Sequence, residues 1–255
     1  MPRGINTQDE GRIQGRNVVN ANSSNIVAPG IVEDGLVLHL DAGNYQSYPI
    51  SGTTTYDLSD RRNNGTLASG VDYLRAAGGL FDFNGTTEKI TVPAGPDFAY
   101  GTGDFSIDGW INNRAAPPTF GATVFAQTVS GTNYLRIYVI GAAREVVLVF
   151  AVSGGGDGNA STSPNGATDN TWKHFAFTRL GTTLTGYLNG VAGTPVTCSQ
   201  DFNNTTYVPT IAQYTHTSND RFTGYIASIR VYKNKGLTPL EVQQNFNATR
   251  ARFNV

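Results

Sequence analysis

The sequence has little charge. Asp, Glu, Lys and Arg make up 15% of its 255 residues, whereas about 25% is usual in globular proteins. That fraction excludes a disordered polyelectrolyte and argues against a helical bundle, because the solvated faces of helices need Lys and Glu. The 18 basic and 19 acidic residues leave a formal net charge of −1. Proteins that coat phosphate backbones are basic, so we expect no nucleic-acid partner.

Cysteine and long apolar runs are also scarce. The single cysteine, Cys198, excludes an internal disulfide, and it lies in a Thr- and Ser-rich segment without a basic residue beside it to activate the thiol. No run approaches the roughly 18 apolar residues of a membrane helix, and the first residues lack the pattern of a secretion signal. We therefore expect a protein made in the cytoplasm, with an inert thiol and no membrane partner.

What the sequence does have is glycine, 30 residues, and a series of short alternating segments from Gly35 onward. Their apolar residues recur with the period of a half-buried strand, and no helical segment separates them. Evenly spaced strands of this kind predict a sandwich of two antiparallel sheets. The pairs Asn84-Gly85 and Asn189-Gly190 each predict a hairpin turn. The expected strands are 36–40, 81–83, 89–92, 105–111, 123–128, 134–140, 145–152, 172–179, 184–188 and 222–232.

One helix is well signalled, at the C-terminal end. Thr238 is suited to the N-cap, Pro239 to the first helical position, and Glu241 completes a capping box. Leu237 and Val242 occupy the two positions of a hydrophobic staple. The pattern predicts a helix over 239–249, and because its apolar residues are few we expect it against the edge of the sandwich.

The N-terminal residues differ from the rest of the chain. Residues 1–25 are rich in Asn, Gly, Gln and Arg and show neither a strand nor a helix period. Alone, such a segment cannot bury enough apolar surface to offset its ordering entropy. We therefore divide the chain into an extended arm, 1–34, and one sandwich domain, 35–255. The arm is either a disordered tail or a segment that orders against a partner. In the second interpretation its binding residues are Arg3, Ile5, Arg12, Ile13, Arg16, Val18 and Val19.

In their order along the chain, these segments resemble the concanavalin A-like lectin/glucanase sandwich, and within it the laminin-G-like branch. The resemblance covers about residues 35–250 and implies an all-β, two-sheet antiparallel jelly-roll sandwich with a short C-terminal helix. The segments that carry it are 35–44, 56–59 with 63–67, 83–85, 105–110, 172–179, 187–190, 224–232 and 237–242.

The opening of the chain carries a narrower resemblance. A Gly-, Arg- and Asn-rich arm followed by the 35–44 segment is similar to structural proteins of bacteriophages, notably phages of marine cyanobacteria. That resemblance implies a non-enzymatic virion protein that decorates the capsid. Its partners would be the major capsid protein or other virion proteins, and sister copies in a homo-oligomer. The alternatives are a tail or fibre subunit, and a carbohydrate-binding module for host glycans.

Catalytic patterns are missing. Glycoside hydrolysis needs two carboxylates about 5–10 Å apart, and enzymes of this superfamily usually carry them on one strand as Glu-x-Asp-x-x-Glu, which does not occur here. The nearest acidic run is Asp104 with Asp108. By alternation, Asp108 lies on the face of the strand opposite Ile107. That face either lines a groove or is a solvated face of the sheet. His39 and His174 lie in strands without a nucleophile pattern beside them. We expect no enzyme.

Calcium is the metal that the resemblance makes possible, although we expect no cofactor. Asp41, Asp57 and Asp60 are hard oxygen ligands in expected loops. Ala227 stands where related sandwiches commonly carry an aspartate, which weakens such a site. Asp57 and Asp60 are equally suited to stabilising turns around Ser59 as Asx caps.

Glycan binding is the remaining possibility. The superfamily often binds sugars through aromatic side chains, and this chain has 12 Tyr, 13 Phe and 2 Trp. Tyr207, Tyr214 and His216 precede the last strand in a polar segment, where they could form a sugar-binding rim. Aromatic residues at alternating strand positions belong to the core instead.

Overall fold

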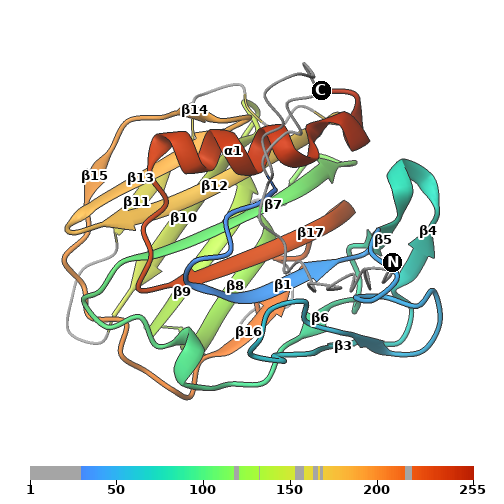
Figure 1. The fold of residues 1–255 in the computed structure, drawn as a ribbon, viewed down its shortest axis with the longest axis horizontal. Helices are drawn as coiled ribbons and strands as arrows, with labels where there is room; N and C mark the ends of the chain where they lie inside the picture. The colour runs from blue at the N-terminus through green and yellow to red at the C-terminus, as the bar shows by residue number, and fades with distance from the viewer. Residues whose placement is uncertain are drawn as a thin grey trace, which may run out of the picture.

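The computed structural model describes residues 30–117, 121–131, 133–152, 158–162, 166, 169–215 and 220–255. Two antiparallel sheets pack face to face, and one α-helix, α1 (Pro239–Thr249), lies on the outside of the sandwich in the described part of the chain (Figure 1). The predicted all-β fold is confirmed. Within the described residues, no helix is long and apolar enough to cross a membrane.

One sheet carries the helix, and we call it the helix-side sheet. Its strands run β14-β13-β12-β7-β17-β5-β4, with β1 paired to β17 and β15 paired to β13. Their bounds are β14 (Val191–Ala192), β13 (Thr183–Leu188), β12 (Trp172–Leu180), β7 (Phe105–Asn113), β17 (Thr223–Lys233), β5 (Leu80–Asn84), β4 (Asp72–Leu74), β1 (Leu36–Asp41) and β15 (Val196–Thr197).

The opposite sheet runs β11-β10-β9-β8-β16-β6-β3-β2. Three short 3-10 turns, η1 (Ala76–Gly78), η2 (Pro96–Phe98) and η3 (Arg250–Phe253), complete the described elements. The strand bounds are β11 (Gly158–Ser161), β10 (Glu145–Ala151), β9 (Asn133–Ile140), β8 (Ala122–Ser130), β16 (Val208–Ile211), β6 (Ile90–Thr91), β3 (Gly65–Leu67) and β2 (Thr54–Thr55).

The main core lies between the sheets. Alternation sends Ile107 and Ile111 of β7 inward, where they share one apolar cluster with Ile137 of β9 and Leu148 of β10. All four side chains are fully buried. Successive strand residues point to opposite faces of a sheet, so the same strands must present their other residues to the outside. On the helix-side sheet those outward residues are buried as well, because the helix covers them.

The helix has the predicted bounds and the predicted cap. The Glu241 amide donates to Thr238 Oγ1 over 3.3 Å, and the Thr238 amide donates to Glu241 Oε2 over 2.9 Å. Its expected place at the sandwich edge is wrong. It crosses the outer face of the helix-side sheet, in front of β12 and β13 in Figure 1, with Phe246 packed on Trp110 at 5.8 Å between ring centroids. The reason is that the outward positions of the central strands carry Trp110 and Ala176, which need a cover.

The two Asn-Gly turns have different outcomes. Asn189-Gly190 joins β13 to its neighbour β14, with φ of 49° and 80°, so the predicted hairpin is confirmed. Asn84-Gly85 does not make a hairpin. The strand before it, β5, belongs to the helix-side sheet, whereas β6 after it pairs in the opposite sheet, so this turn carries the chain across the sandwich.

The seven residues predicted for partner binding in the arm, Arg3 to Val19, lie outside the described residues. The last part of the segment does belong to the folded body. Val32 is buried, its amide donates to Asn245 Oδ1 over 2.8 Å, and its carbonyl accepts from the Tyr232 hydroxyl over 3.1 Å. The Gly30 carbonyl also accepts from Gln244 Nε2 over 2.7 Å, so the described chain is tied to helix α1 from Gly30 onward.

Candidate functional site

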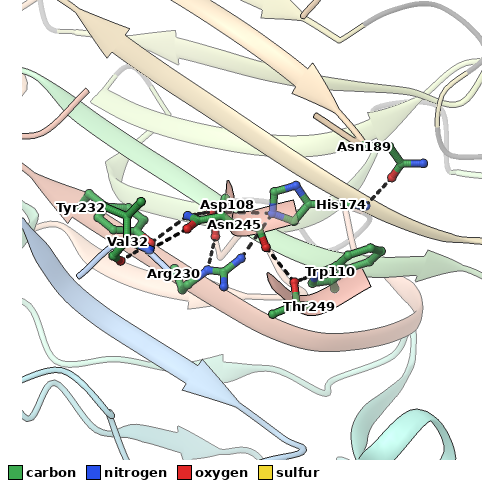
Figure 2. A network of polar contacts seen from close by, with 9 residues as sticks. All are labelled: Val32, Asp108, Trp110, His174, Asn189, Arg230, Tyr232, Asn245 and Thr249. Atoms are coloured by element: carbon green, nitrogen blue, oxygen red, sulfur yellow. Dashed lines mark hydrogen bonds and ion pairs between the residues drawn. The ribbon is translucent and has the colours of Figure 1, made fainter. Parts of the chain in front are cut away.

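The acidic residue on β7 lies in a buried polar network rather than in a groove. Asp108 is fully buried; its Oδ1 accepts from Arg230 Nε over 2.5 Å and its Oδ2 from Asn245 Nδ2 over 2.7 Å (Figure 2). His174 Nε2 lies 3.7 Å from Oδ2 and accepts from Arg230 Nη2 over 3.3 Å. Both open interpretations of Asp108, a groove and a solvated face, are wrong because helix α1 covers it. Asp104 is not part of the network, since its Oδ1 accepts from the Gly181 amide.

Burial and the neighbouring charges together determine the protonation states of Asp108 and His174 in this network. Burial by itself raises the pKa of Asp108, but the Arg230 charge and His174 outweigh it and hold that pKa well below its ordinary value. Burial lowers the pKa of His174, and the nearby carboxylate does not compensate. The stable state is therefore a charged Asp108–Arg230 pair beside a neutral His174 imidazole. This agrees with the hydrogen bond in which His174 Nε2 accepts from the Arg230 guanidinium.

This network holds the helix to the sheet. Asn245 connects the helix to Asp108, to the Tyr232 hydroxyl and to the Val32 amide, and Trp110 Nε1 donates to Thr249 Oγ1 over 2.8 Å (Figure 2). Most of its polar groups are satisfied by one another under a helix, and His174 Nδ1 is the buried atom in it without a hydrogen-bond partner. Such a cluster gives the helix a defined position but presents no group to a ligand.

The single cysteine is buried beneath the outer strands. Burial raises the pKa of Cys198, even though the guanidinium of Arg179 lies close to its sulfur. A basic group is thus nearby, contrary to the expectation from sequence, because β12 brings Arg179 to a segment 19 positions further on. The thiol is nevertheless held in its protonated form, as expected for an inert cysteine.

Of the three acids considered for calcium, Asp41 and Asp57 have separate roles and Asp60 is exposed. Asp41 Oδ1 lies 2.6 Å from Arg252 Nη1. Asp57 accepts from the backbone amides of His39, Ser59 and Asn63, which confirms its predicted role in a turn. Within the described part of the chain, no three His, Cys, Asp or Glu side chains gather closely enough to hold a metal. The structure thus gives the calcium hypothesis no ligand set.

The expected aromatic rim is not a rim. Tyr207 is buried, and its hydroxyl donates to Asn133. Tyr214 is buried as well, with the Arg136 guanidinium 5.0 Å from its ring centroid. His216 lies outside the described residues. The segment before β17 folds back onto the opposite sheet, so its tyrosines pack inward and offer no platform.

Aromatic side chains do gather at a surface hollow elsewhere, at the end of β1 and beside β4. We call it the tyrosine hollow; its volume is about 190 Å³. β4 is the short strand beside β5 at the right of Figure 1. The lining residues are Ala42, Gly43, Tyr45, Tyr48, Ile50, Tyr73, Arg75 and Gly78.

The tyrosines differ in how firmly they are held. Tyr48 and Tyr73 lie 5.3 Å apart between ring centroids, and Tyr48 packs edge-on against Phe81 at 5.1 Å. The Tyr48 hydroxyl donates to the Gly52 carbonyl over 3.1 Å, and burial, together with Tyr73, raises the pKa of Tyr48, so the phenol is neutral. Tyr45 is the opposite case, with 70% of its surface exposed. The hollow thus has two packed rings and one exposed ring.

Arg252 supports the hollow from below. Besides its pairing with Asp41, its guanidinium donates to the carbonyls of Ala77 and Gly79, so it joins the end of β1 to the η1 turn. Gly43 is required here, since a Cβ on it would come within 2.5 Å of the guanidinium carbon. The C-terminal turn η3 therefore fixes both backbone segments that form the floor.

The backbone around the hollow is strained. Ile50, one of the lining residues, has a φ of 68°, and Ala77 beside Gly78 has a φ of 45°. Left-handed backbone is rare for a residue with a Cβ, and for a β-branched residue it is a clear outlier. Such conformations persist where the surrounding structure imposes them, and they concentrate at ligand-binding sites. The surrounding structure therefore holds the backbone at Ile50 and Ala77 in these conformations.

Two larger hollows lie on either side of Leu36, with volumes of about 240 and 300 Å³. Both include Glu33 and Asp60, and the first also includes His39, whose pKa burial and Arg230 lower to about 4. Neither is lined by a Phe, Tyr or Trp ring. Their walls combine carboxylates, basic groups and apolar side chains, so they favour no single class of ligand.

Sequence reasoning missed the tyrosine hollow. A local signal existed, because Tyr45 and Tyr48 stand in a polar turn segment rather than at alternating strand positions. The rest of the site was not visible, since Tyr73 comes from β4 and Arg75 directly follows it, and only the fold brings this segment beside that turn.

Comparison with known families identifies the superfamily of this chain. A laminin-G family model, described as the concanavalin A-like lectin/glucanases superfamily, matches residues 84–243. The chain belongs to this superfamily. The match confirms the resemblance seen in the sequence for the fold and its laminin-G-like branch. It begins after the tyrosine hollow in the chain, so the hollow is built by segments outside the matched region.

Solved structures with the same concanavalin A-like fold include binding domains. Domain 4 of AbnA, a GH43 extracellular arabinanase from Geobacillus stearothermophilus, was solved in complex with arabinotriose; it is 19% identical, with a TM-score of 0.65, and the alignment covers 84% of this chain and 99% of that one. The binding domain of Paraclostridial Mosquitocidal Protein 1 is 18% identical, with a TM-score of 0.67 and coverage of 85% and 52%. The binding domain of Botulinum Neurotoxin DC in complex with SialylT is 15% identical, with a TM-score of 0.66 and the same coverage.

These likenesses show the shared fold. The chain spans nearly all of the arabinanase domain but about half the length of the two toxin domains. A comparison with curated proteins finds no match.

Proposed function

We propose that this protein is a carbohydrate-binding module and that the tyrosine hollow is its sugar site. The observation that carries the proposal is the exposed ring of Tyr45 beside the fixed rings of Tyr48 and Tyr73. Tyrosine offers a large, rigid contact area with a polar tip, and it loses little conformational entropy on binding. Sugar rings, which have apolar faces and hydroxyl edges, fit such a surface.

The size of the hollow sets the size of the ligand. Pockets for drug-sized molecules start at about 300 Å³, and this hollow has about 190 Å³. It accommodates one sugar ring, with the rest of a glycan chain in solvent. The glycan complexes of two proteins with this fold, arabinotriose on the arabinanase domain and SialylT on the neurotoxin domain, support a sugar as the kind of ligand.

The proposal includes binding without hydrolysis. Hydrolysis of a glycosidic bond requires two carboxylates on either side of it, and the residues that line the hollow include no Asp or Glu. Asp108, the acid on the central strand, is committed to Arg230 beneath the helix.

A glycan array with the full-length protein tests this function. We expect binding to a defined group of glycans, and we expect Tyr45→Ala to lose it by at least tenfold. The matched control is Tyr56→Ala, because Tyr56 is also exposed, at 46%, but does not line the hollow. Equal losses in the two variants, or no binding by the natural sequence, would refute the proposal.

The N-terminal arm supports a second proposal, concerning where the module acts. We propose that the protein is a virion component that decorates a phage capsid through residues 1–34 and displays the sandwich outward; a tail or fibre position is the alternative. Support comes from the arm's polar composition and its similarity to phage structural proteins. Partners would be the major capsid or other virion proteins and sister copies. Immunogold labelling of intact particles tests the location: label over the shell supports decoration, label confined to the tail supports the alternative, and unlabelled particles contradict both.

A further inference from the structure

The charge of the tyrosine hollow narrows the class of sugar that it would take. Arg75 is exposed and is the one charged residue in the lining. Among the described residues, no hydrogen bond or ion pair occupies its guanidinium. Other arginines near this end of the molecule are engaged: Arg252 with Asp41, and Arg114 with Asp82 at 2.9 Å. Arg75 is thus the guanidinium that remains available to a ligand.

Arg75 is placed beside the rings where β4 passes into the η1 turn. It directly follows β4, two positions after Tyr73, and both side chains line the hollow. Asp72, the nearest acid in sequence, alternates to the other face, and Leu74 does the same with 39% of its surface exposed. The guanidinium and the phenol ring therefore face the hollow together, and no carboxylate competes for Arg75 there.

The remaining ionisable groups leave the hollow positive. The Asp41 carboxylate beneath it is neutralised by Arg252, and Tyr48 is kept neutral because burial raises its pKa. A guanidinium binds a carboxylate with two parallel N–H···O bonds, which are stronger and more directional than bonds between neutral groups. A ligand that combined a sugar ring with a carboxylate would use the tyrosines and Arg75 at once.

We infer that the tyrosine hollow selects glycans that end in a carboxylated sugar, a uronic acid or a sialic acid. The inference rests on the proposed sugar-binding function. A neutral sugar of the same shape keeps the ring contacts but loses the guanidinium pair. A free carboxylate keeps the pair but loses the rings, so neither half alone accounts for full affinity.

Calorimetric titration of the full-length protein tests the inference with four probes: glucuronate, N-acetylneuraminate, glucose and acetate. We expect the two acidic sugars to bind about tenfold more tightly than glucose, the range of one charge-assisted pair, and acetate to show no saturable binding. Raising the salt concentration should weaken the acidic sugars and leave glucose unchanged, because only the former use a charge.

Variants separate the charge from the ring contacts. Arg75→Gln should reduce glucuronate affinity to the glucose value without changing glucose binding, and Arg75→Lys should retain part of the difference. Arg62→Gln, which removes an exposed arginine outside the hollow, is the matched control and should behave like the natural sequence. Tyr45→Ala should weaken acidic and neutral sugars alike.

The outcomes distinguish the proposed sugar binding from the inferred preference for a carboxylated sugar. If glucose binds as tightly as glucuronate and Arg75→Gln changes neither, the carboxylate inference is overturned while sugar binding stands. If acetate competes as well as glucuronate, the hollow is an anion site and the proposed sugar function fails with the inference. Binding of acidic sugars that requires both Arg75 and Tyr45 supports both claims.

Discussion

The Arg252 guanidinium lies 2.6 Å from the Asp41 carboxylate, so the last turn of the chain is joined to the end of its first strand, 211 residues earlier. The same guanidinium donates to the carbonyls of Ala77 and Gly79. Three segments that are distant in sequence therefore meet directly beneath the tyrosine hollow. The pairing makes the shape of the hollow depend on the C-terminal turn.

Replacing Arg252 should affect both stability and binding. Arg252→Ala leaves the Asp41 carboxylate and two backbone carbonyls without their donor, and loss of a charged, partly buried hydrogen-bonding group costs about 1–3 kcal/mol. We expect the free energy of unfolding in urea to fall by that amount and sugar affinity to fall with it, because the floor of the hollow loses its support. Arg250→Ala, an exposed arginine on the same turn whose guanidinium lies 5.6 Å from the Phe246 ring centroid, is the control; it should cost at most about 1 kcal/mol and leave sugar affinity unchanged. If the Arg252 variant bound sugar normally, the C-terminal turn η3 would not control the shape of the tyrosine hollow.

The buried network predicts a specific pH dependence. Burial lowers the pKa of His174, so the unfolded chain takes up a proton near pH 6.5 that the folded chain does not. The contribution of His174 to stability is therefore complete above about pH 6.5 and declines as the pH falls below it, by up to about 1.4 kcal/mol per pH unit. His39, whose pKa burial and Arg230 lower to about 4, adds a decline of the same sign. The groups facing His174 are Asp108 and Arg230, which stay charged throughout this range. Urea unfolding at pH 7.5, 6.0 and 5.0 measures the decline, and His174→Gln should make it shallower; an unchanged slope would contradict the assignment.

Breaking the buried Asp108–Arg230 pair should lower the free energy of unfolding more than any other change considered for this network. Asp108→Asn leaves the Arg230 guanidinium buried without its counter-charge, and removal of one partner of a buried pair typically costs about 3–5 kcal/mol. Asp104→Asn is the matched control on the same sheet, since Asp104 caps an exposed turn and should cost less than about 1.5 kcal/mol. Similar losses in the two variants would show that the network does not anchor the helix.

The helix cap gives a smaller and more local test. Thr238→Ala removes the oxygen that accepts from the Glu241 amide, and loss of a side-chain N-cap costs about 1 kcal/mol. We expect a single cooperative unfolding transition at slightly lower denaturant concentration. Leu240→Ala, in the same turn but with 82% of its side chain exposed, should be nearly neutral. A loss of 3 kcal/mol or more in the Thr238 variant would mean that the cap controls more than the first turn.

Chelation addresses the calcium hypothesis. Asp41 is paired with Arg252, and Asp57 is saturated by backbone donors, so neither carboxylate is set up for a metal. Excess EDTA should therefore leave the thermal midpoint unchanged. A drop of many degrees that calcium reverses would show a bound ion, because a ligand that binds the folded state stabilises it in proportion to RT ln(1 + [L]/Kd).

The features that sequence alone predicts are those encoded by neighbouring residues. The Thr238–Glu241 capping box spans four residues, and it located the start of the helix to the residue. Alternation along β7 placed Ile107 and Ile111 in the core. In each case the signal and the structure it specifies lie within one element, so no knowledge of the fold is needed.

What sequence could not predict depends on contacts between distant segments. Asp108 reads as a surface acid until the fold brings Arg230, 122 positions away, and Asn245, 137 positions away, against it. The sheet to which β6 belongs is decided by its partner β16, not by the Asn84-Gly85 turn before it. The tyrosine hollow combines a loop with a strand, and each half alone is unremarkable in the sequence.

The most direct test of the central claim, that a sugar binds in the tyrosine hollow, is an NMR titration of the isotope-labelled protein with glucuronate. The account predicts that backbone shift changes concentrate around Tyr45, Tyr73, Arg75 and Gly78, while the hollows beside Leu36 stay unchanged. Shift changes centred on Glu33 and Asp60 instead, or no saturable change at all, would contradict it.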